Sequence, residues 1–185
     1  MVDELGELAR EQGFSLWAAQ MPLLRGLALV RAGEIREGVA LVCQSVADYE
    51  ALGAATSALA ALCLAAGLAR GVEGHALMDN ASARFEHTGV RFLDAEMCRI
   101  RGALLVDRGD VAAAEVQFVK AIDIARGQGA KHWELRAATS LAQLWRDQGR
   151  CTEACGLLAP VYGWFVEGLG TPDLRRAKVL LNQLE

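Results

Sequence analysis

The chain has 185 residues, 53% of them hydrophobic, with three prolines and a net charge of −4. This length and composition favour a folded domain with a substantial core, argue against disorder, and lack the basic footprint of a nucleic-acid-binding protein. Five cysteines leave at least one unpaired, and no secretory signal precedes them, so we expect reduced thiols in a cytoplasmic protein.

The first twelve residues have the pattern of the end of a helix whose partner is absent. The segment ELAREQGFSLW (7–17) is similar to DIARGQGAKHW (123–133), with Gly13 matching Gly129. In the later copy, this segment ends one helix pair and begins the next. Glycine at such a place supplies the left-handed residue that follows a helix. We therefore predict a partial repeat over residues 1–12.

Helical periodicity then continues through four pairs of apolar runs. The pairs are expected over residues 14–52, 54–87, 92–126 and 131–167. Glycines mark the tight corners between runs, at Gly33, Gly109 and Gly149. Proline lies inside two of the runs, at Pro22 and Pro160, and we expect each proline to bend its helix.

One stretch, residues 51–69, has no charged side chain over nineteen residues. A membrane-spanning helix needs about twenty predominantly apolar residues. This stretch is instead rich in alanine and also carries Thr56 and Ser57. A helix that is buried on several sides by other helices has the same composition. We therefore expect a core helix here, and no membrane segment in the chain.

The C-terminal end of the chain predicts a capping helix over residues 172–184. Thr171, Pro172 and Asp173 supply an N-cap, a first-turn proline and an acidic first turn. Apolar side chains then form one stripe, made of Leu174, Ala177, Leu181 and Leu184. Basic residues lie off this stripe and can face water.

Small residues recur along the chain with a fixed period. The first series, Gly26, Leu62, Gly102 and Ala142, and the second, Gly38, Gly74, Ala114 and Ala154, are both spaced by 36, 40 and 40 residues. Four residues after the second series come the large apolar residues Val42, Met78, Phe118 and Leu158. This pattern resembles the tetratricopeptide repeat, although its usual period is about 34 residues and Leu62 is not small. The resemblance implies an all-α fold, in which helical hairpins form a solenoid: a single domain over residues 1–185, wound as a right-handed superhelix and closed by the capping helix.

The last third of the chain carries a more specific resemblance. The segments ELRAATSLAQLWRDQGR (134–150), LLAPVYGWFVEG (157–168) and TPDLRRAKVLL (171–181) are similar to the C-terminal region of bacterial multidomain signalling regulators. In those proteins a nucleotide-cyclase or DNA-binding module is joined to a signal-transduction ATPase and then to tetratricopeptide-like repeats. The resemblance implies a sensory or regulatory repeat region, with no catalytic residue carried over.

Motifs for chemistry are missing from the sequence. There is no G-x-x-x-x-G-K or G-x-G-x-x-G loop to hold phosphates. Cys151 and Cys155 share one helix face, and could be a redox pair or half of a metal site, but no further ligand lies at metal-binding spacing. We expect them to be core residues. The chain is therefore predicted to be a non-enzyme with no metal and no cofactor; an enzyme would need a pocket of converging titratable groups.

The expected function is binding of a protein or peptide. In the resembled repeats, a groove is lined by positions that flank the small residue of the first helix of each pair. The resemblance places in this groove Arg99, Arg136, Thr139, Gln143 and Arg146. These side chains suit a polar or acidic peptide, or they are solvated charges on helix surfaces.

Two further expectations concern association. An array without an N-terminal cap exposes apolar surface, and we expect self-association as a homodimer through Leu23, Leu24, Leu27 and Val30. The segment SLAQLWRDQGRCTEACGLLA (140–159) also imitates a helix-turn-helix, so a directly DNA-associated transcriptional regulator is the alternative. The acidity of the chain argues against direct binding of nucleic acid.

Overall fold

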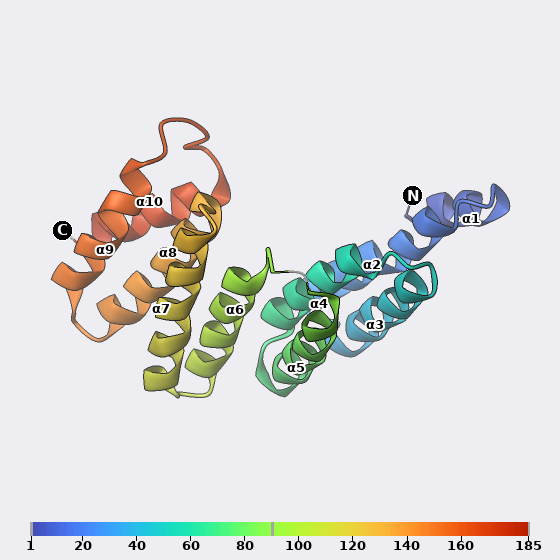
Figure 1. Cartoon of the computed structure of the whole chain (residues 1–185), viewed down its shortest axis with the longest axis horizontal. Helices are drawn as coiled ribbons and strands as arrows, with labels where there is room; N and C mark the ends of the chain where they lie inside the picture. The colour runs from blue at the N-terminus through green and yellow to red at the C-terminus, as the bar shows by residue number, and fades with distance from the viewer. Residues whose placement is uncertain (1, 90, 185) are drawn as a thin grey trace. The chain divides into compact units, whose positions relative to one another are not determined.

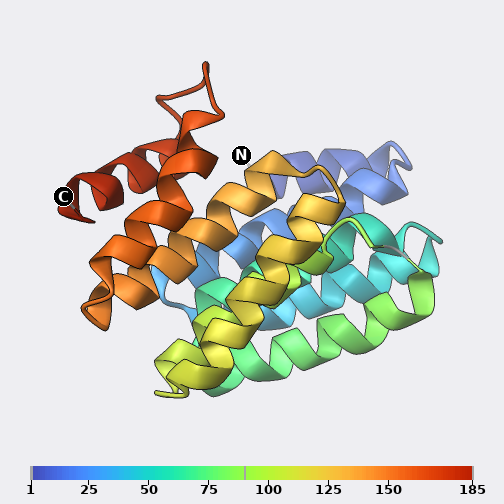
Figure 2. The same cartoon turned by 60° about the vertical axis from the view of Figure 1, so that its left-hand side comes forward.

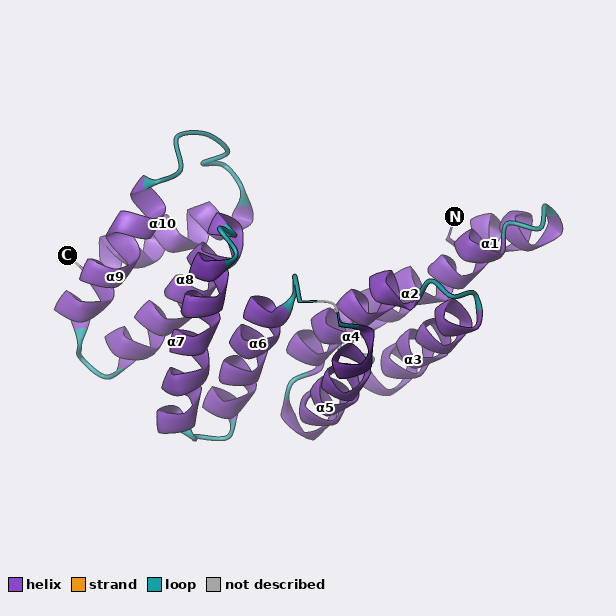
Figure 3. Ribbon diagram, viewed as in Figure 1, coloured by secondary structure: helices purple, strands orange, loops and turns teal. Residues whose placement is uncertain are grey.

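The computed structural model describes residues 2–89 and 91–184, and over these residues it contains helices and loops only (Figure 3). The helices before residue 90 are α1 (Val2–Glu11), α2 (Ser15–Ala32), α3 (Ile35–Ala51), α4 (Ala55–Ala69) and α5 (Gly71–Thr88). Those after it are α6 (Asp94–Asp107), α7 (Val111–Gly127), α8 (Lys131–Asp147), α9 (Cys151–Gly163) and α10 (Pro172–Leu184). The prediction of an all-α protein is confirmed.

The helices group into two compact units, Met1–Arg91 and Phe92–Glu185, where the sequence predicts one domain. Each unit has its own core. In the first unit, the most deeply buried large side chains are Val42, Val46, Leu59, Leu62 and Met78. In the second unit, the core includes Phe118, Leu135, Leu141, Leu158 and Leu174. Among the described residues, no helix is both long enough and apolar enough to cross a membrane.

Helices adjacent in the chain pack against each other within each unit (Figures 1 and 2). In the first unit, α1 contacts α2, α2 contacts α3, α3 contacts α4 and α4 contacts α5; α2 also contacts α4. The second unit has the same order from α6 to α10, and there α6 contacts α8 and α8 contacts α10. The predicted pairs correspond to α2 with α3, α4 with α5, α6 with α7, and α8 with α9.

The recurring small residues lie where paired helices meet, as the spacing predicts. A Cβ added to Gly26 would lie 2.7 Å from the carbonyl oxygen of Gly38, and one added to Gly102 would lie 2.5 Å from the ring of Phe118. Ala114 and Ala154 are fully buried. Side chains larger than these would hold the helices apart, because protein interiors have no spare volume for them.

The two similar segments form the same corner in the two units. Gly13 and Gly129 both have positive φ, 72° and 65°. Five backbone hydrogen bonds recur 116 residues apart, with N···O distances that agree to within 0.2 Å. Examples are Phe14 N to Ala9 O at 2.8 Å, and Ala130 N to Ala125 O at 2.9 Å. The α1–α2 corner and the α7–α8 corner are therefore local copies of each other.

A polar network joins three elements of the second unit. The indole N–H of Trp145 in α8 donates to Glu115 Oε1 in α7 at 2.7 Å. The Arg150 guanidinium, just before α9, lies 4.5 Å from the Trp145 ring and also donates to Glu115 at 3.0 Å. Trp145 is thus both a packing residue and a hydrogen-bond donor, as a partly buried tryptophan usually is.

Two details near the C-terminus differ from the prediction. The helix expected to reach residue 167 ends at Gly163, where Phe165 N turns back to Tyr162 O. Gly163 and the nearby Pro160 both disfavour continuation of the helix. In α10, which begins at Pro172 as predicted, Leu180 is buried and Leu181 only half-buried. Both leucines border the apolar stripe, and the packing against α8 and α9 decides which is buried.

Candidate functional site: a polar groove and an open pocket

In the second unit, side chains from α6, α8 and α10 line a small polar pocket of about 30 Å³. Its lining residues are Arg99, Arg136, Thr139, Ser140, Asp173 and Arg176. Three of the five predicted groove residues, Arg99, Arg136 and Thr139, are therefore brought together. A pocket of this volume holds about one small group, so it would hold one side-chain end of a ligand and no whole metabolite.

A buried carboxylate organises the two arginines. Glu96 is only 6% exposed, and it accepts from Arg99 Nε at 2.8 Å and Arg99 Nη2 at 2.7 Å. Arg136 Nη2 lies 2.9 Å from the same carboxylate. Glu96 thus fixes both guanidinium groups, because a buried charge is stable only when it is paired and hydrogen-bonded.

Asp173, at the start of α10, borders the other side of the pocket. Its Oδ2 lies 4.0 Å from Arg136 Nε and 3.2 Å from His132 Nε2. The Arg136 guanidinium also lies 5.4 Å from the Trp133 ring. The Thr139 and Ser140 hydroxyls donate to carbonyls one turn earlier in α8, so in this arrangement they offer a ligand only acceptor oxygens.

The remaining two predicted groove residues continue along α8 toward its C-terminus. Arg176 Nη2 in α10 donates to Gln143 Oε1 at 3.1 Å. Arg146 donates to the Gln183 side chain of α10 and to Asp147 at 2.7 Å. Gln143 and Arg146 are thus outside the pocket but lie on the same α8–α10 seam. Among the described residues, no carboxylate pairs with Arg176, which leaves one guanidinium charge unbalanced beside the pocket.

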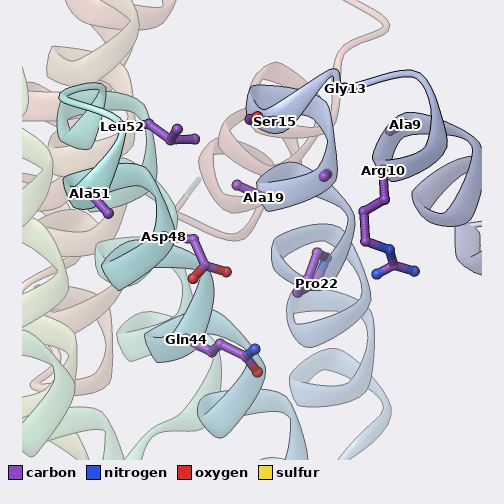
Figure 4. Close-up of a pocket in the computed structure, with 11 residues that line it drawn as sticks. Ala9, Arg10, Gly13, Ser15, Ala19, Pro22, Gln44, Asp48, Ala51 and Leu52 are labelled. Atoms are coloured by element: carbon purple, nitrogen blue, oxygen red, sulfur yellow. The ribbon is translucent and has the colours of Figure 1, made fainter.

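A second, larger pocket lies in the first unit, between α1 and α3 (Figure 4). Its volume is about 520 Å³. Arg10 of α1 lies on one side, Gln44 and Asp48 of α3 lie on the other, and Ser15, Ala19 and Pro22 of α2 lie between them (Figure 4). The sequence predicts no site at this place.

The four residues expected to mediate self-association all belong to α2, but they differ in exposure. Leu23 and Val30 are buried inside the first unit, at 7% and 2% exposure. Leu24 is 44% exposed, and Leu27 is half-buried. Only Leu24 and part of Leu27 are accessible to a second copy while the unit stays folded. The period of the α2 helix explains the difference, since Leu23 and Val30 are seven residues apart and lie on one buried face of the helix.

The cysteines are free thiols in the structure. Cys151 and Cys155 are half-buried on α9 and pack against the core of the second unit. Burial raises the pKa of the Cys98 thiol, although the charges of Lys120 and Arg101 oppose this shift. A raised pKa makes that thiol less reactive. Within the described part of the chain, no group of three or more His, Cys, Asp or Glu side chains could hold a metal ion.

Sequence reasoning did not identify three members of the polar site, namely Glu96, Asp173 and Arg176. Glu96, Asp173 and Arg176 are on helices with many charges, which are usually solvated. One signal was present: Glu96 and Arg99 are three residues apart, a spacing that brings side chains together on a helix.

Neither a scan of the chain against protein-family models nor a search of curated proteins gives a match.

Proposed function

We propose that this protein is a non-catalytic scaffold that binds a protein or peptide partner along the α8–α10 seam. The observation that carries the proposal is the convergence of Arg99, Arg136 and Arg176 around one pocket, with a buried Glu96 holding two of them. Arginines fixed in this way recognise carboxylates with defined geometry, because their orientation does not have to be ordered on binding.

The partner that suits this seam is an acidic peptide. Arg99 and Arg136 are largely neutralised by Glu96 and Asp173, whereas Arg176 donates to the neutral amide of Gln143. The positions of Gln143 and Arg146 farther along α8 extend the polar surface beyond the pocket. An acidic side chain at the pocket would balance Arg176, and polar peptide groups would continue toward Gln183.

The arrangement of helices supports a tetratricopeptide-like solenoid as the setting of this seam. Adjacent helices pack as hairpins, and alternate helices also touch, as in α6 with α8. With the resemblance of the C-terminal third, this supports a role as the sensory or regulatory region of a bacterial signalling or transcription regulator in the cytoplasm. The homodimer through α2 belongs to the same proposal, and rests on exposed Leu24.

The test is binding of labelled peptides from a random library sorted by charge, measured by fluorescence polarisation. Acidic peptides should bind, and the Arg136→Glu, Arg146→Glu double variant should bind them at least about tenfold more weakly. Because Arg136→Glu places a second carboxylate beside Glu96, the exposed Arg176→Glu serves as a milder variant. Arg31→Glu, Arg36→Glu in the first unit is the matched control. Equal binding by wild type and both groove variants would refute the assignment.

A further inference from the structure

The α7–α8 corner of the second unit holds a buried carboxylate. Glu134 is 3% exposed, and it accepts from Arg126 Nε at 2.8 Å and from Lys131 Nζ at 2.7 Å. Burial alone would raise the pKa of Glu134, but the hydrogen bonds and charges of Arg126 and Lys131 outweigh it and lower that pKa. This corner therefore stabilises an ionised carboxylate between one guanidinium and one further donor.

The α1–α2 corner has the same backbone but lacks the carboxylate. The recurring backbone hydrogen bonds pair each residue of this corner with the residue 116 positions later. Arg10 then matches Arg126, Ser15 matches Lys131, and Ala18 matches Glu134. Within the described residues, the Arg10 guanidinium makes no ion pair. Arg10, Ser15 and Ala18 all line the pocket of about 520 Å³.

The opposite wall of this pocket carries a negative charge. Asp48 and Gln44 of α3 face Arg10 across Pro22 (Figure 4). Asp48 lies as far after the start of α3 as Trp164 lies after the start of α9, so Trp164 is its counterpart in the second unit. The Trp164 ring lies 5.9 Å from Lys131 Nζ. The second unit thus has the larger side chains of Glu134 and Trp164 where the first unit has Ala18 and Asp48.

The floor of the pocket contributes one more polar atom. Pro22 has no N–H, so the carbonyl of Ala18 lacks its usual helical donor four residues later. Ala18 and Pro22 are both only half-buried. This carbonyl can accept a hydrogen bond from a bound molecule, and Ala19 and Pro22 supply apolar contact beside it.

We propose that this pocket binds a small zwitterion, with its carboxylate on Arg10 and Ser15 and its ammonium group on Asp48 and the Ala18 carbonyl. The ligand class is a free amino acid or an amino acid with a terminal amine on an aliphatic chain. A plain anion fits less well, because the carboxylate of Asp48 lines the same pocket as Arg10. The volume lies within the range of about 300–1,000 Å³ common to small-molecule pockets. This site does not depend on the α8–α10 seam.

The experiment is an NMR titration of the full chain with terminal-amine amino acids of increasing length: aminobutyrate, aminohexanoate and aminooctanoate. One length should bind best, with saturable shifts of the Ser15, Ala18 and Asp48 amides. Hexanoate and hexylamine, which each lack one charge, should bind at least about tenfold more weakly than aminohexanoate if each charged contact is made. Equal binding by hexanoate would refute the zwitterion, and no saturable shift with any compound would refute the site.

Substitutions in the pocket distinguish binding at this site from nonspecific binding. Arg10→Gln and Asp48→Asn should each weaken binding about tenfold or more. Ala18→Glu supplies the carboxylate that the second unit already has, so it should pair with Arg10 and abolish binding while the helical content is unchanged. Ala112→Glu, at an exposed site of α7, is the matched control and should bind like wild type. Undiminished binding by Arg10→Gln or Ala18→Glu would overturn the proposal.

One further measurement tests whether the bound carboxylate and ammonium group belong to a free small molecule or to a peptide. A blocked dipeptide, acetyl-Lys-Glu-amide, carries the ammonium and carboxylate on side chains. Weaker binding of this dipeptide than of the best free amino acid supports a small-molecule site. Tighter binding would overturn that part of the proposal and assign the pocket to a peptide segment.

Discussion

Gly26 of α2 and Gly38 of α3 lie against each other, so that a Cβ added to Gly26 would lie 2.7 Å from the Gly38 carbonyl oxygen, and one added to Gly38 would lie 2.6 Å from the Gly26 carbonyl oxygen. Real Cβ atoms do not approach backbone oxygens this closely. The distance between these two helices therefore depends on the absence of both side chains, and backbone on both sides blocks any local adjustment.

Gly38→Ala is expected to destabilise the first unit by about 1–3 kcal/mol, through overpacking against α2. Chemical denaturation with the midpoint compared to wild type measures the loss. Gly156→Ala in α9 is the matched control, because that glycine is exposed and a Cβ there meets nothing within 4 Å. The control should be neutral or stabilised by about 0.5–1 kcal/mol. A Gly38→Ala midpoint equal to wild type would contradict the close approach.

Ala114→Leu tests the same relationship in the second unit. Ala114 is fully buried at the α6–α7 contact, so the larger side chain should cost about 1–3 kcal/mol of unfolding free energy. Ala112→Leu, on the exposed side of α7, should leave the denaturation midpoint nearly unchanged. If both variants behave alike, the predicted register of the small residues fails.

Glu134→Gln should destabilise the second unit by about 1–3 kcal/mol near neutral pH, because Arg126 and Lys131 lose their carboxylate. The folded-state pKa of Glu134 is lowered, so its contribution is present above the unfolded pKa and disappears as pH falls through the folded value. The stability difference between wild type and variant should therefore shrink in acid. A difference that is constant with pH, or equal in the exposed control Glu153→Gln, would contradict this account.

Self-association should depend on Leu24. If the proposed homodimer forms through α2, Leu24→Glu should shift the chain toward the monomer, with its fold intact because Leu24 is exposed. Light scattering at several protein concentrations measures the change. Leu64→Glu, at another exposed leucine of the first unit, is the control. A wild-type chain that is monomeric at all concentrations would contradict the proposed homodimer.

The sequence predicts most of this fold because its signals are local. Periodicity locates the helices, and the small residues that mark helix contacts recur at nearly constant spacing. The end of α9 and the burial of Leu180 were not predicted, since both depend on how α10 packs against its neighbours. In the polar site, the resemblance to the repeat family places Arg99, Arg136 and Thr139 in one groove. Glu96 and Asp173 were not predicted there, because only the folded unit brings α6 and α10 against α8.

The larger pocket was not predicted, although the similarity between its corner and the later one was. A main difference is Ala18 in place of Glu134, and the absence of a side chain gives no positive signal in a sequence. Arg10 appears there as one charge among several on an acidic helix. Its significance depends on the geometry of its counterpart Arg126, which binds a carboxylate.

The Trp145 network gives the second unit an intrinsic spectroscopic reporter. Its indole proton is held by Glu115 while the Arg150 cation lies over the ring. The hydrogen bond to Glu115 should slow exchange of this indole proton with solvent for as long as α7, α8 and the start of α9 stay packed. Trp17, the single tryptophan of the first unit, is 59% exposed and has no such protection. Indole resonances can therefore be followed during unfolding to show whether the two units open together or in sequence.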